Sequence, residues 1–149
     1  MPMGMTKAMR DADKWLNRAY ALNLELEANE RHLDKLANSL NSGVSRYKSD
    51  GTESHDPEIA KANHEDTLLE YSATMARVEK LRRNLNAENI KTLKAIDQLS
   101  NGDLRAIATD RYVNCMTWEA IGKAEYISKS EVDRRKNRML EQMVRIIQN

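Results

Sequence analysis

The sequence predicts an all-α protein, with a long antiparallel helical hairpin of coiled-coil type followed by three shorter helices. The chain of 149 residues has no Phe, two Pro and five Gly, and 32% of its residues are charged. This composition favours helices, because straight-chain residues and Ala lose little rotamer freedom in a helix. The aromatic fraction of 5% is too low for a β-sandwich or β-barrel of this length.

One helix of about 30 residues is expected between Met5 and Asn41, because no Pro or Gly interrupts this stretch. Apolar residues recur along it in alternating steps of four and three, which is the heptad pattern of a helix that packs against another helix. Asn29 is the one polar member of this stripe, and a buried Asn in such a seam often fixes the register of pairing. The stripe consists of Trp15, Ala19, Leu22, Leu26, Asn29, Leu33, Leu36 and Leu40.

The segment 41–57 is rich in Ser, Gly and Asp, and we expect an exposed loop there. A second helix follows, with Asp56 as its N-cap and Pro57 at its first position. Two long helices joined by one loop most simply fold back as a hairpin, which would make residues 1–99 the first domain. The second helix has a looser stripe with a period nearer that of an ideal helix: Leu68, Tyr71, Met75, Val78, Leu81, Leu85, Ile90, Leu93 and Ile96.

Residues 100–149 are expected to form a second domain of three shorter helices, each with a capping signal. Ser100 and Asp103 have capping-box spacing before the first helix, Thr117 caps the second, and Ser128 and Glu131 form a capping box for the third. The inner face of the first helix, which ends near Asn114, consists of Leu104, Ile107, Ala108, Tyr112 and Val113. The inner faces of the other two consist of Trp118, Ile121 and Ala124, and of Val132, Met139, Met143 and Ile147.

A basic cluster lies directly behind the turn that joins the last two helices. The net charge of the chain is only +1, yet five of the nine Lys and Arg in residues 100–149 lie between Lys129 and Arg138. Two short helices joined by a turn of about four residues are typical of a helix-turn-helix, whose second helix enters the major groove of DNA. The sequence therefore predicts contact with duplex DNA at the start of the third helix.

The candidate DNA-binding residues follow from the face of that helix. If Val132 faces the core, then Arg134 and Asn137 lie on the opposite side, with Ser130 and Glu141. Arg can pair with guanine and Asn with adenine, while the free N–H groups behind Thr117 favour a phosphate. The predicted DNA-binding residues are Thr117, Lys129, Ser130, Asp133, Arg134, Arg135, Asn137 and Arg138.

The stretch 111–140 reads RYVNCMTWEAIGKAEYISKSEVDRRKNRML. It resembles the sigma-factor region 4 type of helix-turn-helix in small phage transcription regulators, and it is similar to the ArpU/RinA group of late-gene activators and an allied phage family. Four positions depart from that pattern: Glu125 and Arg135 stand where apolar residues are usual, Tyr126 stands where a glycine is common, and Ile127 replaces the usual Tyr. An alternative alignment displaces the turn by one residue. The matching positions are Arg111-Tyr112, Trp118-Glu119-Ala120-Ile121, Ile127-Ser128 and Val132-Asp133-Arg134.

The resemblance implies a phage or prophage transcription regulator that activates late genes and binds double-stranded DNA in the cytoplasm of its bacterial host. The helical hairpin would then supply homodimerisation or a contact with the host RNA polymerase. Two alternatives remain open. One is a coiled-coil adaptor or inhibitor that docks another protein without DNA binding, and the near-zero net charge favours it. The other is a DNA-binding protein of packaging, like a small terminase subunit.

We expect neither an enzyme nor a cofactor. The sequence has no GxxxxGKS or GxGxxG loop for a nucleotide, and His32, His55 and His64 lack the HExxH or CxxC spacing of a metal site. Cys115 is the only cysteine and cannot form an internal disulfide, which favours a reducing cytosol. No apolar run approaches the roughly 20 residues that span a bilayer, and the N-terminus lacks the apolar segment of a secretory signal.

Overall fold

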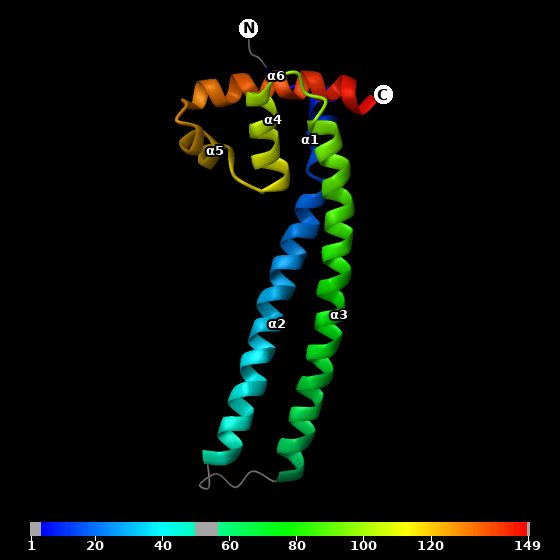
Figure 1. Ribbon diagram of the computed structural model, residues 1–149, viewed down its shortest axis with the longest axis vertical. Helices are drawn as coiled ribbons and strands as arrows, with labels where there is room; N and C mark the ends of the chain where they lie inside the picture. Colours follow the sequence, from blue (N-terminus) through cyan, green and yellow to red (C-terminus); the bar gives the residue numbers. More distant parts are fainter. Residues whose placement is uncertain (1–3, 50–56, 149) are drawn as a thin grey trace. The chain divides into compact units, whose positions relative to one another are not determined.

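The computed structural model describes residues 4–49 and 57–148, and it places the side chains of residues 4–42 and 58–148. The described residues contain helices and no strand, so the protein is all-α, as predicted (Figure 1). By their contacts they form two compact units, Met1–Leu22 with Leu85–Asn149, and Asn23–Asn84. The elements are α1 (Lys7–Leu16), α2 (Arg18–Ser49), α3 (Pro57–Ile96), α4 (Gly102–Ala108), the π-helical turn η1 (Thr109–Val113), α5 (Trp118–Glu125) and α6 (Lys129–Gln148).

The first helical stretch differs from the prediction in two places. The expected helix from Met5 to Asn41 is divided at Asn17, which has φ −83° and ψ 0° and ends α1. Beyond Asn41, α2 continues to Ser49, so the predicted loop 41–57 is helical over its first half. No Gly or Pro marks the break at Asn17, and the Ser-, Gly- and Asp-rich composition from residue 41 onward does not end α2 before Ser49. Asp56 lies outside the described residues, whereas Pro57 stands at the first position of α3, as expected.

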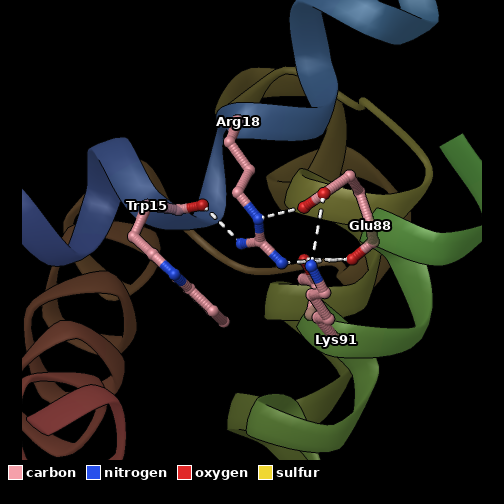
Figure 2. A network of polar contacts seen from close by, with 5 residues as sticks. Trp15, Arg18, Glu88 and Lys91 are labelled. Atoms are coloured by element: carbon pink, nitrogen blue, oxygen red, sulfur yellow. Dashed lines mark hydrogen bonds and ion pairs between the residues drawn. The ribbon is translucent and has the colours of Figure 1, made fainter. Parts of the chain in front are cut away.

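Arg18 gives a physical reason for the break at Asn17. Its Nη1 donates to the carbonyl of Trp15 at 2.7 Å, and its guanidinium lies 3.8 Å from the centroid of the Trp15 ring. The same guanidinium pairs with the carboxylate of Glu88 in α3 and donates to the Glu88 carbonyl at 3.2 Å (Figure 2). A carbonyl engaged by a side chain is no longer reserved for the helix ladder, so the chain can change direction here.

The unit that contains both termini has one hydrophobic core. α1 and α4 both pack against α6, and α5 packs against α6 as well. The hydroxyl of Tyr112 donates to Asp13 Oδ1 at 2.6 Å, which joins η1 to α1 across 99 residues of sequence. Burial, followed by this hydrogen bond, raises the pKa of Tyr112 well above its ordinary value. The core consists of Met9, Ala12, Leu16, Ala95, Ile96, Leu99, Leu104, Ile107, Ala108, Tyr112, Ile121, Met139, Leu140 and Met143.

The predicted inner faces of the last three helices are mostly confirmed. The predicted core residues of α4 are buried, as are Tyr112 of η1, Ile121, and three of the four predicted for α6, whereas Val113 is only partly buried. Ala124 is exposed, so its assignment to the core was wrong. Leu140, which the prediction omitted, is fully buried beside Met139. The inner face of α6 is therefore wider than one residue per turn, because α1 and α4 both cover it.

The unit Asn23–Asn84 consists of one segment of α2 and one of α3 that run antiparallel. Asn29 accepts a hydrogen bond from Arg77 Nη1 at 3.3 Å, and His32 contacts Glu70 at 2.9 Å. Residues later in α2 thus meet residues earlier in α3. Asn29 is half-buried, and its amide also donates to the carbonyl of Glu25 at 2.8 Å.

The stripe of α3 is a strict heptad rather than the looser pattern that the sequence suggested. Leu68, Ile90 and Leu93 are exposed, so placing them in the stripe was wrong. Thr74 and Thr92 are buried instead, and a stripe drawn through apolar residues alone misses them. The observed seam recurs in steps of three and four: Tyr71, Thr74, Val78, Leu81, Leu85, Glu88, Thr92 and Ala95.

Candidate nucleic-acid interface

The cap of α4 differs from the one that the sequence indicated. Asn101, rather than Ser100, is the N-cap, and its Oδ1 accepts from the N–H of Asp103 at 2.8 Å. Ser100 is bonded to α6 instead. Its N–H donates to Gln142 Oε1 at 3.0 Å, and its hydroxyl accepts from Gln142 Nε2 at 2.8 Å. These two bonds fix the segment between α3 and α4 against the C-terminal half of α6.

The π-helical turn η1 and helix α5 meet around one tryptophan. The ring of Trp118 packs edge-on against Tyr112, with centroids 6.3 Å apart. Arg111 from η1 and Lys136 from α6 lie over the same ring, 5.4 Å and 5.1 Å from its centroid. Thr117 caps α5 as predicted, because its Oγ1 accepts from the N–H of Ala120 at 3.1 Å. The half-buried ring of Trp118 therefore holds α5 against η1 and α6.

The turn between α5 and α6 consists of residues 126–128. Tyr126 adopts the left-handed conformation, with φ 57° and ψ 41°, and its side chain is 94% exposed. The next N–H, that of Ile127, donates back to the carbonyl of Gly122 at 3.0 Å. A Cβ at Gly122 would lie 3.1 Å from Val132 Cγ2, so glycine allows the two helices to approach closely. α5, this short turn and α6 have the connectivity of a helix-turn-helix.

The start of α6 forms only half of the predicted capping box. Ser128 Oγ accepts from the N–H of Glu131 at 3.2 Å, as expected. The carboxylate of Glu131, however, turns to its own helix: Oε2 accepts from Arg134 Nη1 at 3.0 Å and Oε1 from Arg135 Nε at 3.2 Å. Residues three and four positions apart are neighbours on a helix surface, which accounts for both pairs.

The predicted DNA-binding residues fall into two groups. Arg135 and Asn137 are partly buried, and the side chain of Arg135 is 21% exposed against 69% for Arg134. Among the exposed side chains from Lys129 to Arg138, three are basic and only Asp133 is acidic, so the exposed face carries a positive excess. Arg111, Glu131 and Lys136 adjoin this face and were missed as site residues. The i+3 and i+4 spacing from Glu131 would have indicated its two pairs. The exposed group is Thr117, Lys129, Ser130, Asp133, Arg134 and Arg138.

The remaining candidate features are a metal site, the cysteine and a membrane-spanning helix. Among the side chains that the structure places, no three His, Cys, Asp or Glu residues come together as a metal site would require. His55 lies outside the described residues. Cys115 is half-buried in the segment between η1 and α5, with φ 59°. In the described parts of the chain, no helix has both the length and the apolar character that crossing a membrane requires.

The geometry defines an all-α protein in which three exposed cations, Lys129, Arg134 and Arg138, lie along the first half of α6. No family model, no curated protein and no solved structure matches this chain. The function must therefore be argued from the site itself.

Proposed function

We propose that the protein is a phage or prophage transcription regulator, an activator of late genes, that binds duplex DNA through the first turns of α6. The observation that supports this most directly is the exposure of Lys129, Arg134 and Arg138, just behind a tight turn. A helix that reads DNA must present such side chains along a face that no other element covers. The resemblance of residues 111–140 to phage regulators motivates the class of protein.

In this proposal the elements have separate roles. Arg134 donates to guanine in the major groove, while Lys129 and Arg138 neutralise phosphates on either side. Thr117 presents the N-terminus of α5 to the phosphate backbone. The helices of the Asn23–Asn84 unit supply homodimerisation or a contact with the host RNA polymerase, and the protein acts in the bacterial cytoplasm.

The test is selection from a library of duplexes with a randomised centre, followed by gel-shift titration. Arg134→Ala should weaken binding to the enriched duplex by about 1–3 kcal/mol and relax specificity at one position. Arg145→Ala is the matched control, because Arg145 is an exposed arginine in the last turn of the same helix. Unchanged binding after combined replacement of Lys129, Arg134 and Asn137 by Ala would contradict the site.

A protein-interaction adaptor is the second candidate, and the exposed leucines of the long helices favour it. Leu24 is 48% exposed and Leu69 is 70% exposed. Salt dependence separates the two functions, because release of counterions from several phosphates makes DNA affinity fall steeply with salt, whereas an apolar interface responds little. A terminase-like role in packaging would share the DNA binding but show ring assembly in light scattering.

A further inference from the structure

The carboxylate of Glu131 has hydrogen-bond partners that differ from those usual at its position in a helix. As the third residue of α6, it stands where a glutamate commonly reaches back to the N-cap N–H. Instead, each of its two carboxylate oxygens accepts from a different arginine, at 3.0 Å from Arg134 and 3.2 Å from Arg135. Its side chain is 31% exposed, so the pairs are shielded on one side by the helix itself. One carboxylate thus joins an exposed arginine to a covered one.

The two arginines are held differently. Arg135 is anchored, with its side chain only 21% exposed and its Nε directed at Glu131 Oε1. Arg134 is 69% exposed and is bonded to Glu131 through Nη1. A single bond at one Nη leaves the other N–H groups of the guanidinium fork for a ligand. The guanidinium is thereby oriented before any ligand arrives, which lowers the conformational entropy that binding would cost.

We propose that Glu131 is a positioning and specificity-determining residue for DNA, acting through Arg134. This inference rests on the proposed function, since it concerns the same face of α6. Glu131 aligns the free edge of the Arg134 guanidinium for bidentate donation to guanine. Its negative charge also opposes indiscriminate phosphate binding, because it cancels one of the two adjacent cations. Discrimination between duplexes therefore depends on a residue that itself touches no base.

The experiment uses the full-length chain, the most enriched duplex from the randomised library, and a scrambled duplex of the same base composition. Glu131→Gln keeps the shape of the side chain and removes its charge. We expect affinity for the scrambled duplex to rise roughly threefold, as expected for loss of one negative charge near phosphates. The ratio of affinities for the enriched and scrambled duplexes should fall by about tenfold.

Two further variants distinguish positioning from a general effect. Glu141→Gln makes the same charge change on an exposed residue about 15 Å farther along α6, and the ratio should stay unchanged. In an Arg134→Ala background, Glu131→Gln should no longer alter the ratio, because the residue acts through Arg134. Thermal unfolding of each variant shows whether α6 remains folded. If Glu131→Gln still lowers the ratio of affinities in the Arg134→Ala background, Glu131 acts through helix stability, and the inference is overturned.

The remaining outcomes separate the inference from the function on which it rests. If the unmodified chain binds no duplex, the proposed function fails and the inference fails with it. If the unmodified chain enriches a sequence but Glu131→Gln retains its discrimination ratio, the inference alone is overturned. If the unmodified chain binds all duplexes with equal affinity, the inference is also overturned, because there is then no discrimination between duplexes for Glu131 to control.

Discussion

Tyr126 occupies a left-handed backbone conformation, and its side chain is 94% exposed. A residue with a Cβ in this region costs roughly 1–2 kcal/mol, and Tyr126 recovers little of that through burial. Tyr126→Gly should therefore raise the free energy of unfolding by about 1 kcal/mol, after allowance for the greater freedom of glycine in the unfolded chain. Urea denaturation monitored by circular dichroism measures this change.

The matched control for this prediction is Tyr126→Ala. Alanine removes the aromatic ring but keeps the Cβ, so the conformational cost stays and stability should change little. If the glycine and alanine variants are equally stable, the gain does not come from the backbone, and the left-handed turn is not a source of strain.

Glu88 makes stability depend on pH through its contact with Arg18. The hydrogen bond from Arg18 holds the pKa of the Glu88 carboxyl below its ordinary value of 4.5, with Lys91 adding to the effect. A carboxyl with a lowered pKa contributes stability above its ordinary pKa, and this contribution is lost as the pH falls through the lowered value. Glu88→Gln should therefore lower the melting temperature at pH 7, and the difference from the unmodified chain should shrink below pH 4.5.

Glu79→Gln serves as the comparison, because Glu79 lies on the same helix with an exposed side chain. The melting temperature of Glu79→Gln should equal that of the unmodified chain both at pH 7 and below pH 4.5. A Glu88→Gln difference that stays constant from neutral to acidic pH would show that the pairing with Arg18 does not govern it.

At the scale of the elements, α1 contributes residues to the core that supports α6, the helix of the candidate interface. Leu16 is fully buried in the cluster that contains Met139 and Met143 of α6. Leu16→Ala should lower the free energy of unfolding by about 2–5 kcal/mol, because it leaves a cavity beneath α6. The same substitution should weaken the proposed DNA binding near the melting temperature, although Leu16 lies more than a hundred residues from Arg134 in sequence.

Leu24→Ala is the control at this scale, since Leu24 is 48% exposed and its loss creates no buried cavity. Equilibrium urea denaturation of the two variants compares them directly. Equal effects would mean that α1 does not stabilise the helix-turn-helix, and that residues 100–149 form a core of their own.

The elements were predictable where their signals are local. Thr117 and Ser128 cap the helices that the sequence assigned to them, and Pro57 opens α3. Caps depend on side chains within three residues of a helix end, so they can be read from sequence. The break at Asn17 could not be read in this way, because Arg18 engages Glu88, 70 residues away.

At the scale of the whole molecule, the two compact units differ in the depth of their cores. In Asn23–Asn84 the buried residues among those described are Leu26, Leu36, Thr74, Val78 and Leu81, spaced along two helices. The other unit buries a contiguous cluster. Local opening requires least free energy where few apolar contacts are lost. Amide hydrogen exchange should therefore be faster in residues 24–40 than in residues 136–144.

Mass spectrometry of exchanged peptides from the full chain measures this contrast at several protein concentrations. Protection of residues 24–40 that rises with concentration would indicate a dimer formed through this unit. Equal protection of the two segments at low concentration would contradict the difference in core depth.

Composition, caps and periodicity act over a few residues, so the all-α class, the starts of α3, α5 and α6, and most of the apolar faces of the last three helices follow from the sequence alone. Three features depend on contacts between distant parts of the chain: which residues of the α3 seam are buried, where the first helix divides, and how far Arg134 and Arg135 differ in exposure. The contacts Tyr112–Asp13 and Arg18–Glu88 join residues that lie far apart in the chain, and the burial of a residue likewise depends on distant elements. No local sequence pattern encodes either one.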